Sequence, residues 1–495
     1  MAGNLPYVIG VFMNKELLSQ DYKKVFHYFS EISAVPRGSK YNTAISNYLV
    51  EFAKNHNLFY KQDEFENVII IKEASVGYEE APPVIIQGHM DMVCEKTSDC
   101  THDFLTEGID LYVDGDYVHA DRTTLGGDNG IAVAYGLSLL DDETLKHPRL
   151  EVIFTTDEEI GMDGAIGVDV SQLKGKYLLN VDSEDEGTIL TSSAGGLTGT
   201  CDLPIKRTSE KGVKIDLSIS ELQGGHSGAE IHKNRVNATK LMARLLFELR
   251  ECAGFYLLDL KGGLKDNAIP RDSIASIVAE PEYVQELIQK VEELTKKYKT
   301  EFSTQEPSLT IQVNKGIEDK YKVLHPTSFE KVLFLLVNAP NGVQAMSNDI
   351  PGLVESSLNL GVFHMDEEVA SFCYSVRSSV NSYKEFLKNK LDYMSTFLGG
   401  EFYVRSEYPA WEFKKESALR EYLCKVFKEE YGYEAKLEAI HAGLECSFFA
   451  EKIPGVDIVS LGPDMMDIHT PKERLSISSS IRVYKYLEKV IEGLK

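Results

Sequence analysis

Residues 84–91 read Val-Ile-Ile-Gln-Gly-His-Met-Asp, and this segment is the clearest indication of the fold class. A short β-branched run that passes directly into glycine and polar residues is typical of a buried strand whose carboxyl end opens into a loop. Two further strand patterns end in the same way, because Leu150–Thr156 is followed by acidic residues and Tyr177–Val181 is followed by Asp182. In open α/β sheets, ligands bind outside the carboxyl ends of the strands. We therefore expect a site at this edge.

The segments around these strands alternate between helix and strand patterns. Apolar residues recur at helical spacing in Asn14–Ile32 and Tyr41–His56, and Asn67–Lys72 is a further short strand pattern. Asn129–Leu140 is an apolar helix pattern that begins after a Gly-Gly-Asp turn. This alternation predicts an α/β domain with a mostly parallel sheet flanked by helices.

The middle of the chain has a different character. Its strand patterns alternate polar and apolar residues, as one-sided antiparallel sheets do. They are Val213–Ser220, Ser273–Ala279, Leu309–Val313, Val354–Phe363 and Ser371–Ser378, with helix patterns at Asn234–Glu251 and Pro281–Tyr298. The α/β character returns with the helix pattern Ala418–Tyr431, the strand pattern Val456–Leu461 and the helix pattern Ser476–Leu494. We expect one α/β domain, formed by residues 1–187 and 403–495, interrupted by an inserted α+β domain at 188–402.

Composition and charge exclude several classes of function. The chain has 52 basic and 77 acidic residues and a net charge of −25, so its surface repels phosphate backbones and anionic lipids. We expect neither a nucleic-acid nor a membrane partner. Seven cysteines at irregular spacings without a Cys-x-x-Cys pair predict reduced thiols. Leu5–Met13 lacks the flanks of a signal peptide, and runs such as Val332–Val337 are too short to span a bilayer, which indicates a cytoplasmic protein.

Acidic residues and a histidine gather at the predicted strand ends and in a glycine-rich loop. They are His89, Asp91, Asp128, Glu158, Glu159 and Asp182. Five carboxylates and an imidazole in one crevice cannot all stay ionised without a counter-charge, which one or two divalent metals supply. Mixed histidine and carboxylate ligands suit zinc, and cobalt or manganese would also fit.

Taken singly, each feature has a plainer interpretation. A His-x-Asp pair at a loop start is common, Glu158-Glu159 suits an exposed helix N-terminus, and Asp182 begins an acidic loop. His226 lies between glycines, in either a plain turn or an exposed functional loop, and His469 is equally a capping, core or ligand histidine. The metal interpretation gains its force because the acidic groups end separate strands.

Five motifs, in this order, resemble the two-zinc exopeptidases that include carboxypeptidase G, aminoacylase and the carnosinases. They are Gly88-His89-Met90-Asp91, Leu125-Gly126-Gly127-Asp128-Asn129-Gly130, Asp157-Glu158-Glu159-Ile160-Gly161, Gly225-His226-Ser227-Gly228 and His469-Thr470-Pro471. Within that family the chain most resembles the bacterial aminoacyl-histidine dipeptidases (peptidase D), through Val35–Ser39, Asn180–Glu184 and His441–Cys446. The resemblance extends over essentially the whole chain.

The resemblance implies a catalytic domain, interrupted by a lid, with two zinc ions. His89 and Asp182 would hold one zinc, Glu159 and His469 the other, and Asp128 would bridge both. It further implies that unblocked dipeptides, Xaa-His among them, are hydrolysed by an activated water, and that the lid forms a homodimer contact.

The resemblance also assigns catalytic and substrate-binding residues. Glu158 would be the general base, Asp91 would orient the His89 ring, and His226 would donate to the oxyanion. The residues it implies for substrate binding are Asn267, Arg377, Gly443 and Glu445. For Arg377, a surface arginine on a strand is the alternative. The chain departs from the subgroup at Arg122 and Ser447, where glycine is common, and both changes bear on substrate preference.

Other functions are weighed against this one. An N-acyl amino acid hydrolase or a tripeptidase of the same family would have the same metal centre, so the sequence separates them poorly. A non-catalytic metal-binding protein of the same fold is a third hypothesis, against which the complete set of ligands and Glu158 argues. A nucleotide-binding enzyme is excluded, because the chain has neither a GxxxxGK[ST] motif nor a GxGxxG motif between a strand and a helix.

Overall fold

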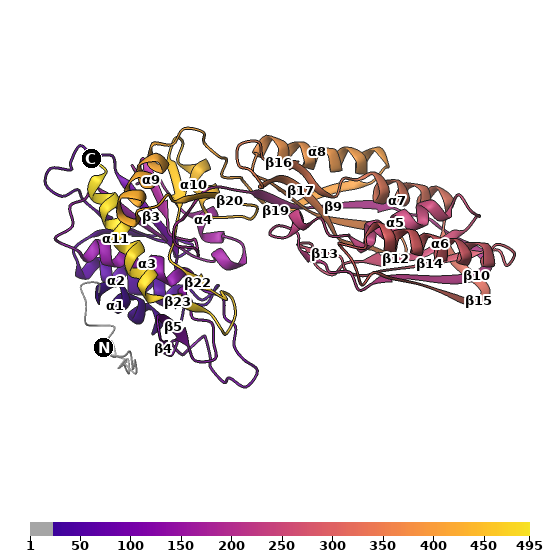
Figure 1. The fold of residues 1–495 in the computed structure, drawn as a ribbon, viewed down its shortest axis with the longest axis horizontal. Helices are drawn as coiled ribbons and strands as arrows, with labels where there is room; N and C mark the ends of the chain where they lie inside the picture. The colour runs from indigo at the N-terminus through magenta and orange to yellow at the C-terminus, as the bar shows by residue number, and fades with distance from the viewer. Residues whose placement is uncertain (1–22) are drawn as a thin grey trace. The chain divides into compact units, whose positions relative to one another are not determined.

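The structure is a computed structural model that describes residues 23–495 (Figure 1). The predicted helix Asn14–Ile32 is seen from Lys23 onward as α1 (Lys23–Ser33), whereas its first part and the run Leu5–Met13 lie outside the described residues. The chain divides into two compact units. Unit 1 contains the residues up to Ser192 together with Phe413–Ala439 and Glu445–Lys495, and unit 2 contains Ser193–Glu412 and Ile440–Leu444.

The main sheet of unit 1 has eight strands in the order β1-β2-β6-β3-β7-β21-β8-β20. They are β1 (Phe59–Gln62), β2 (Val68–Lys72), β6 (Leu150–Thr155), β3 (Val84–His89), β7 (Tyr177–Asn180), β21 (Asp457–Ser460), β8 (Thr188–Ser193) and β20 (Lys436–Ile440). The centre is parallel, as predicted, because β3 pairs in parallel with β6 and β7, and β7 pairs in parallel with β21. Antiparallel pairs lie outside this centre, at β1–β2, β2–β6 and β21–β8.

Helices pack around this sheet and bury its central strands. They are α1, α2 (Thr43–Asn55), α3 (Gly127–Asp141), α4 (Asp163–Gly167), α9 (Ala418–Tyr431), α10 (Cys446–Lys452) and α11 (Ile477–Gly493), with the short η1 turn at Glu158–Ile160. α3 packs on β3, and nearly every residue of α3 is buried. A helix that is apolar on all sides belongs in an interior. The packing of α3 on β3 therefore places the first turn of α3 beside the end of β3.

A second, four-stranded sheet in unit 1 brings the C-terminal segment next to an early hairpin. Its order is β22-β23-β5-β4, with β22 (Met465–Met466), β23 (Arg474–Ser476), β5 (Tyr117–Ala120) and β4 (Leu111–Asp114). The loop between β22 and β23 carries His469, so this sheet sets where that histidine lies.

Unit 2 is built on a nine-stranded sheet with the order β15-β10-β14-β12-β17-β18-β9-β19, in which β16 also pairs with β17. Its strands are β9 (Gly195–Pro204), β10 (Arg207–Ser220), β12 (Tyr256–Gly262), β14 (Ser273–Ala279), β15 (Thr310–Leu324), β16 (Gly342–Met346), β17 (Val354–Met365), β18 (Val369–Ser378) and β19 (Glu401–Tyr408). The pairs along this order are antiparallel. Burial alternates along the second half of β10, as predicted for a sheet covered on one face.

The helices of unit 2 complete the α+β architecture that the sequence predicted. They are α5 (Ala238–Leu249), α6 (Val284–Glu301), α7 (Pro326–Asn338) and α8 (Asn381–Phe397), with the η2 turn at Ile231–Lys233 and the small pair β11 (Gly225–His226) and β13 (Ala268–Ile269). Neither α7 nor α8 was predicted from the sequence. A proline at the first turn of α7, after the capping His325, is a helix-start signal that was available.

The boundaries of the insertion differ from those expected at 188 and 402. Residue 402 lies inside β19, and β19 pairs with β9 along the edge of the unit 2 sheet, so unit 2 continues to Glu412. Ile440–Leu444, which the expected scheme gave to the first domain, also belongs to unit 2. Among the helices of residues 23–495, none is long and apolar enough to cross a membrane.

Candidate metal centre

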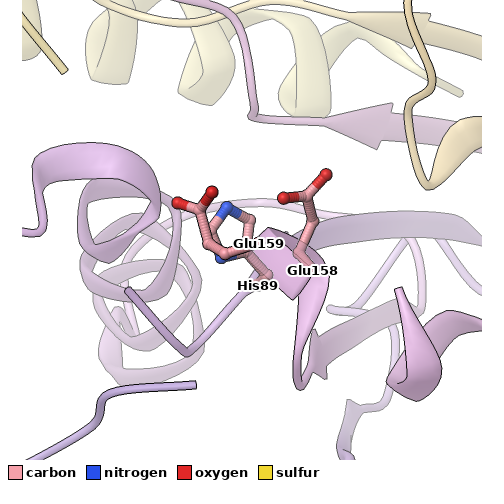
Figure 2. A group of neighbouring side chains, drawn as sticks. All are labelled: His89, Glu158 and Glu159. Atoms are coloured by element: carbon pink, nitrogen blue, oxygen red, sulfur yellow. The ribbon is translucent and has the colours of Figure 1, made fainter. Parts of the chain in front are cut away.

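The parallel strands of unit 1 bring the predicted acidic residues to one edge. His89 is the last residue of β3, Glu158 and Glu159 form the η1 turn after β6, and Asp182 lies just beyond β7. Figure 2 shows His89, Glu158 and Glu159 together at this edge. One potential ligand atom from each of these three residues lies within 4.8 Å of the other two.

Asp128 and His469 reach the same edge from other elements. Asp128 lies at the start of α3, where its backbone is not helical and its peptide bond to Asn129 is cis. One carboxylate oxygen of Asp128, Oδ1, is 3.1 Å from Nε2 of His89, and the other, Oδ2, is 3.1 Å from Nε2 of His469. Asp128 therefore lies between the two histidines.

Two further carboxylates complete a group around each histidine. Asp182 Oδ1 is 3.6 Å from Nε2 of His89, and Glu159 Oε1 is 3.0 Å from Nε2 of His469. The structure thus forms two three-residue groups that share Asp128, each with its ligand atoms within 4.8 Å of one another.

Burial perturbs the protonation of these groups strongly. It raises the pKa of Glu158 well above its ordinary value, and nearby carboxylates such as Asp182 add to the rise. Burial also raises the pKa of Asp182 and Glu159. Hydrogen bonds to Asp128 and Glu159 raise the pKa of the His469 imidazole to about 10. Without a positive counter-ion, these carboxyl groups and the imidazole therefore keep their protons to a higher pH than the free side chains do.

The donor set fits a pair of divalent cations. Burial raises the pKa of a carboxylate when no positive charge compensates it, and a divalent ion is the largest local charge that removes this penalty. Imidazole nitrogen and carboxylate oxygen are ligands of zinc, and also of cobalt and manganese. Asp128 offers one oxygen to each side, as a carboxylate shared by two ions requires.

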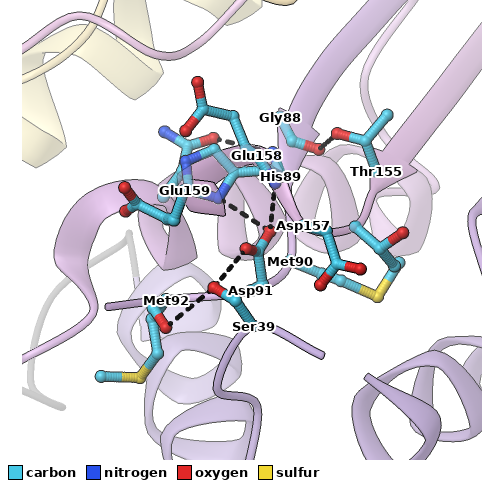
Figure 3. Close-up of polar contacts among 12 residues, drawn as sticks. Ser39, Gly88, His89, Met90, Asp91, Met92, Thr155, Asp157, Glu158 and Glu159 are labelled. Atoms are coloured by element: carbon cyan, nitrogen blue, oxygen red, sulfur yellow. Dashed lines mark hydrogen bonds and ion pairs between the residues drawn. The ribbon is translucent and has the colours of Figure 1, made fainter. Parts of the chain in front are cut away.

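Asp91 contacts His89, Glu158 and Ser39 (Figure 3). Its Oδ1 is 3.3 Å from Nδ1 of His89 and accepts a hydrogen bond of 3.2 Å from the backbone N–H of Glu158. Its Oδ2 accepts a hydrogen bond of 2.8 Å from the hydroxyl of Ser39. Asp91 therefore lies within reach of the His89 ring, and the orienting role that the resemblance implies for it stays a prediction. No role was predicted for Ser39, which belongs to the motif Val35–Ser39.

The turn that carries Glu158 and Glu159 is held by the residue before it. Asp157 has φ 56°, and its Oδ1 accepts hydrogen bonds from the backbone N–H of Lys40 at 2.6 Å and from the Asn42 side chain at 2.8 Å. The segment that begins at Val35 thus supports both Asp91 and the η1 turn.

Four of the predicted residues lie in unit 2: His226, Asn267, Arg377 and Gly443. β11 pairs with β13, and the backbone N–H of Ser227 donates to the Asn267 carbonyl at 2.9 Å, so Asn267 and His226 lie on neighbouring segments. A Cβ built on Gly228 would lie 3.0 Å from His226 Cε1 and 3.1 Å from Arg377 Nε. The structure therefore brings His226 and Arg377 together, and only glycine leaves room for them.

The ring of His226 has a defined protonation state. Its Nδ1 accepts hydrogen bonds from the backbone N–H groups of Gly228 at 3.2 Å and Ala229 at 3.0 Å. Burial, and then the charge of Arg377, lower the pKa of His226. The ring is therefore neutral at pH 7, with its proton on Nε2, which makes Nε2 a hydrogen-bond donor.

Glu445 differs from the expectation that it contacts substrate. It lies in unit 1 and is fully buried. Its Oε2 accepts hydrogen bonds from Gln87 Nε2 at 2.6 Å and Thr155 Oγ1 at 2.7 Å, and burial raises the pKa of its carboxyl to about 8. Because Gln87 and Thr155 lie in the neighbouring strands β3 and β6, Glu445 forms a hydrogen bond to each of these strands.

The structure shows the surroundings of Arg122 and Ser447, the two residues at which the chain departs from the subgroup. Arg122 has φ 62°, in the left-handed region that favours glycine, and its side chain pairs with Asp121 at 3.3 Å. Ser447 is fully buried in α10. Neither residue belongs to the groups around Asp128.

This fold and this group of converging histidines and carboxylates define a metal-dependent peptidase. Residues 85–493 match the family described as Peptidase family M20/M25/M40. The chain belongs to this family, which confirms the resemblance found in the motifs.

Two relatives are similar over nearly their whole length. The chain is 34% identical over 481 residues to the cytosol non-specific dipeptidase of Escherichia coli, covering 97% of this chain and 99% of that protein. The crystal structure of an aminoacylhistidine dipeptidase from Vibrio alginolyticus matches with a TM-score of 0.90 and 32% identity, covering 98% of this chain and 99% of that one. A tripeptidase from Staphylococcus aureus shares the fold, with a TM-score of 0.54, 15% identity and coverage of 95% and 98%.

Proposed function

We propose that this chain is a two-metal dipeptidase that hydrolyses unblocked dipeptides, Xaa-His among them. The observation that carries the proposal is Asp128, whose two oxygens each lie 3.1 Å from a histidine, with Glu158 beside them. The names and full-length similarity of the two relatives support dipeptides as the substrate class.

The metal ligands are divided between two ions. His89 and Asp182 would hold one cation, Glu159 and His469 would hold the other, and Asp128 would be shared; the interatomic distances support this division. Zinc is the proposed metal, and cobalt or manganese fit the same donors. When bound, the cations supply Lewis acidity that lowers the pKa of water and polarises the substrate carbonyl.

Glu158 is the proposed general base. Its carboxylate takes the proton of the attacking water and then delivers it to the leaving amine nitrogen. The adjacent carboxylate of Glu159 lies 3.0 Å from Nε2 of His469, which suits it to bind metal together with that histidine and not to act as the base. Asp91 holds the ring of His89 and the backbone of Glu158, so it aligns a ligand with the base.

Unit 2 supplies the groups that recognise substrate. Nε2 of His226 donates to the developing oxyanion, and the neutral ring described above supports this role. Arg377 binds the substrate carboxylate through its guanidinium, whose Nη1 donates to the Tyr408 hydroxyl at 3.2 Å. Asn267 and Gly443 contact the substrate backbone. In this proposal unit 2 acts as a lid that closes during turnover.

Two further statements extend the proposal. The chain works in the cytoplasm, as the name of the Escherichia coli relative supports. It forms a homodimer through unit 2, and the His226 that serves each site comes from either the same or the partner subunit.

Amine release from four substrate sets tests the proposed function. The sets are unblocked Xaa-His dipeptides including β-Ala-His, other unblocked dipeptides, N-acetylated amino acids, and tripeptides. Each is assayed with metal-stripped protein and again after zinc, cobalt or manganese is restored. We expect cleavage of unblocked dipeptides that depends on metal. Cleavage of only the acetylated compounds or only the tripeptides would replace this assignment with the sister activity, and two bound metals without any cleavage would favour a non-catalytic protein.

A further inference from the structure

A buried carboxylate that the proposed reaction does not use holds the turn before Asp128. Glu473 is 3% exposed. Its Oε2 accepts from the backbone N–H groups of Leu125 at 2.8 Å and Gly126 at 3.1 Å, and its Oε1 accepts from those of Gly127 at 2.7 Å and Asp128 at 3.3 Å. Four consecutive backbone donors thus converge on one carboxylate, which orients the whole turn.

A buried arginine holds the same turn through its carbonyl oxygen. Arg37 is 2% exposed, and its Nη2 donates to the carbonyl of Gly126. Its Nη1 donates to the carbonyls of Met90 at 3.2 Å and Asp91 at 3.3 Å. The turn is therefore held by two buried charges. The Glu473 carboxylate accepts from its N–H groups, and the Arg37 guanidinium donates to its carbonyl and to the carbonyls of the two residues after His89.

Glycine at position 126 is required by this arrangement. Its φ is 67°, and a Cβ at Gly126 would lie 2.4 Å from Nη2 of Arg37. A side chain at this position would displace the guanidinium from the turn, so both the positive φ and the close approach of Arg37 require glycine at position 126.

Glu473 also connects the turn to His469. It lies four residues after His469 in the same loop, and its backbone N–H donates to the Thr470 carbonyl at 3.1 Å. One short segment therefore supplies His469 and fixes the backbone of Asp128, the two groups whose side chains meet at 3.1 Å.

We infer that Glu473 is a positioning residue for the metal pair: its carboxylate sets the separation of Asp128 from His469 and so determines how tightly cations bind. This inference rests on the proposed function. Glu473→Gln keeps the size of the side chain but replaces one oxygen by an NH₂ group, which cannot accept from two of the four backbone donors.

The test measures cation affinity in the folded protein. Wild type, Glu473→Gln and the control Glu492→Gln, a change at an exposed glutamate of α11, are titrated with zinc against a competing chelator. Circular dichroism establishes that each variant is folded, and the visible absorption of cobalt-loaded protein reports the ligand geometry. We expect zinc affinity to fall about 10–100-fold in Glu473→Gln, with an altered cobalt spectrum, and no change in the control.

Wild-type zinc affinity and cobalt spectrum in folded Glu473→Gln would overturn the inference, even if its melting temperature fell, because that result describes a purely structural residue. Should Glu473→Gln fail to fold, Glu473→Asp provides the same measurement with the charge kept on a shorter side chain. A wild-type chain that binds two cations but cleaves no peptide would refute the proposed function, whereas the affinities would still decide the role of Glu473.

Discussion

Oδ1 of Asp91 lies 3.3 Å from Nδ1 of His89, and the side chains of both residues are 1% exposed or less. The same oxygen accepts the backbone N–H of Glu158, and the other carboxylate oxygen accepts the hydroxyl of Ser39. A single buried carboxylate thus links a proposed metal ligand, the proposed base and the segment that begins at Val35.

Replacing this carboxylate tests the link. We expect Asp91→Asn to lower zinc affinity and turnover about 10–100-fold, because an amide orients and polarises the His89 ring less well than a carboxylate. Ser39→Ala is the matched control: it removes one neutral hydrogen bond to Asp91 and should have a smaller effect. Zinc titration and steady-state kinetics on the two variants make the comparison. Equal, wild-type zinc affinity in both variants would contradict the orienting role.

The adjacent residues Glu158 and Glu159 should separate catalysis from metal binding. Glu158→Ala is expected to retain both metals and to lose about 10²–10⁴-fold in turnover, because it removes the base. Glu159→Ala should lose one metal, because it removes the carboxylate that lies 3.0 Å from His469. Metal content by mass spectrometry and kcat measured on the same samples distinguish the two. Near-native turnover in Glu158→Ala would show that the base has been assigned to the wrong residue.

We expect Arg377 to bind the C-terminal carboxylate of the substrate. A hydrogen bond to a charged group contributes about 1.5–3 kcal/mol, so we expect Arg377→Ala to raise KM for a dipeptide by about 10–100-fold. The control is the same dipeptide with an amidated C-terminus, for which wild type and variant should differ little. If the variant lowers kcat/KM equally for both substrates, Arg377 does not bind the carboxylate.

Glu445 should support the sheet rather than bind substrate. Glu445→Ala removes the acceptor that the Gln87 amide and the Thr155 hydroxyl share, and leaves Gln87 only its 3.2 Å hydrogen bond to Thr155, which costs about 1–3 kcal/mol of the free energy of unfolding. Glu445→Gln keeps an oxygen for Gln87 and Thr155, so it should lose less. Denaturant unfolding of both variants, together with KM for a dipeptide, provides the comparison. A raised KM with unchanged stability in Glu445→Ala would restore the substrate-binding role.

His441 should make the stability of unit 2 depend on pH. Burial, and then Arg377, lower the pKa of His441 to about 3, while an unfolded histidine has a pKa of about 6.5. Below 6.5 the unfolded chain binds a proton that the folded unit does not bind until about 3, so acidification favours unfolding. At pH 5 this amounts to about 2 kcal/mol relative to pH 8.

The measurement compares unfolding between pH 8 and pH 5 in wild type and His441→Gln. The loss of stability should be smaller by that amount in the variant, which keeps a partner for the Ser357 hydroxyl. His232→Gln, a change at an exposed histidine of the same unit, is the control. Parallel pH profiles in wild type and His441→Gln would refute the prediction.

The strand ends and their acidic residues could be predicted because they depend on local pattern. A β-branched run that ends in polar residues identifies a buried strand, and parallel strands end at a common edge. His89, Glu158 and Asp182 therefore converge as the sequence predicts. The domain boundary near 402 could not be placed in this way, because β19 joins the sheet of unit 2 through its pairing with β9, nearly two hundred residues away.

The supporting residues could not be recognised from sequence for a related reason. Glu473 and Arg37 are charged residues in loops, and charged residues in loops are usually exposed. They are buried because they form hydrogen bonds to backbone groups of the 125–128 turn. This turn is distant from both residues in the sequence, and every residue type has the same backbone groups, so the amino-acid sequence does not reveal these contacts. Glu445 was assigned to substrate because its motif resembles a substrate-side turn, whereas its hydrogen bonds are to Gln87 and Thr155.

The position of β21 between β7 and β8 has a consequence for synthesis on the ribosome. All the strands of the unit 2 sheet have emerged before β21 is made, whereas the unit 1 sheet lacks an internal strand until residues 457–460 appear. His469 and Glu473 are made later still. A nascent chain that ends before residue 469 therefore lacks both the histidine that lies beside Asp128 and the carboxylate that holds the 125–128 turn.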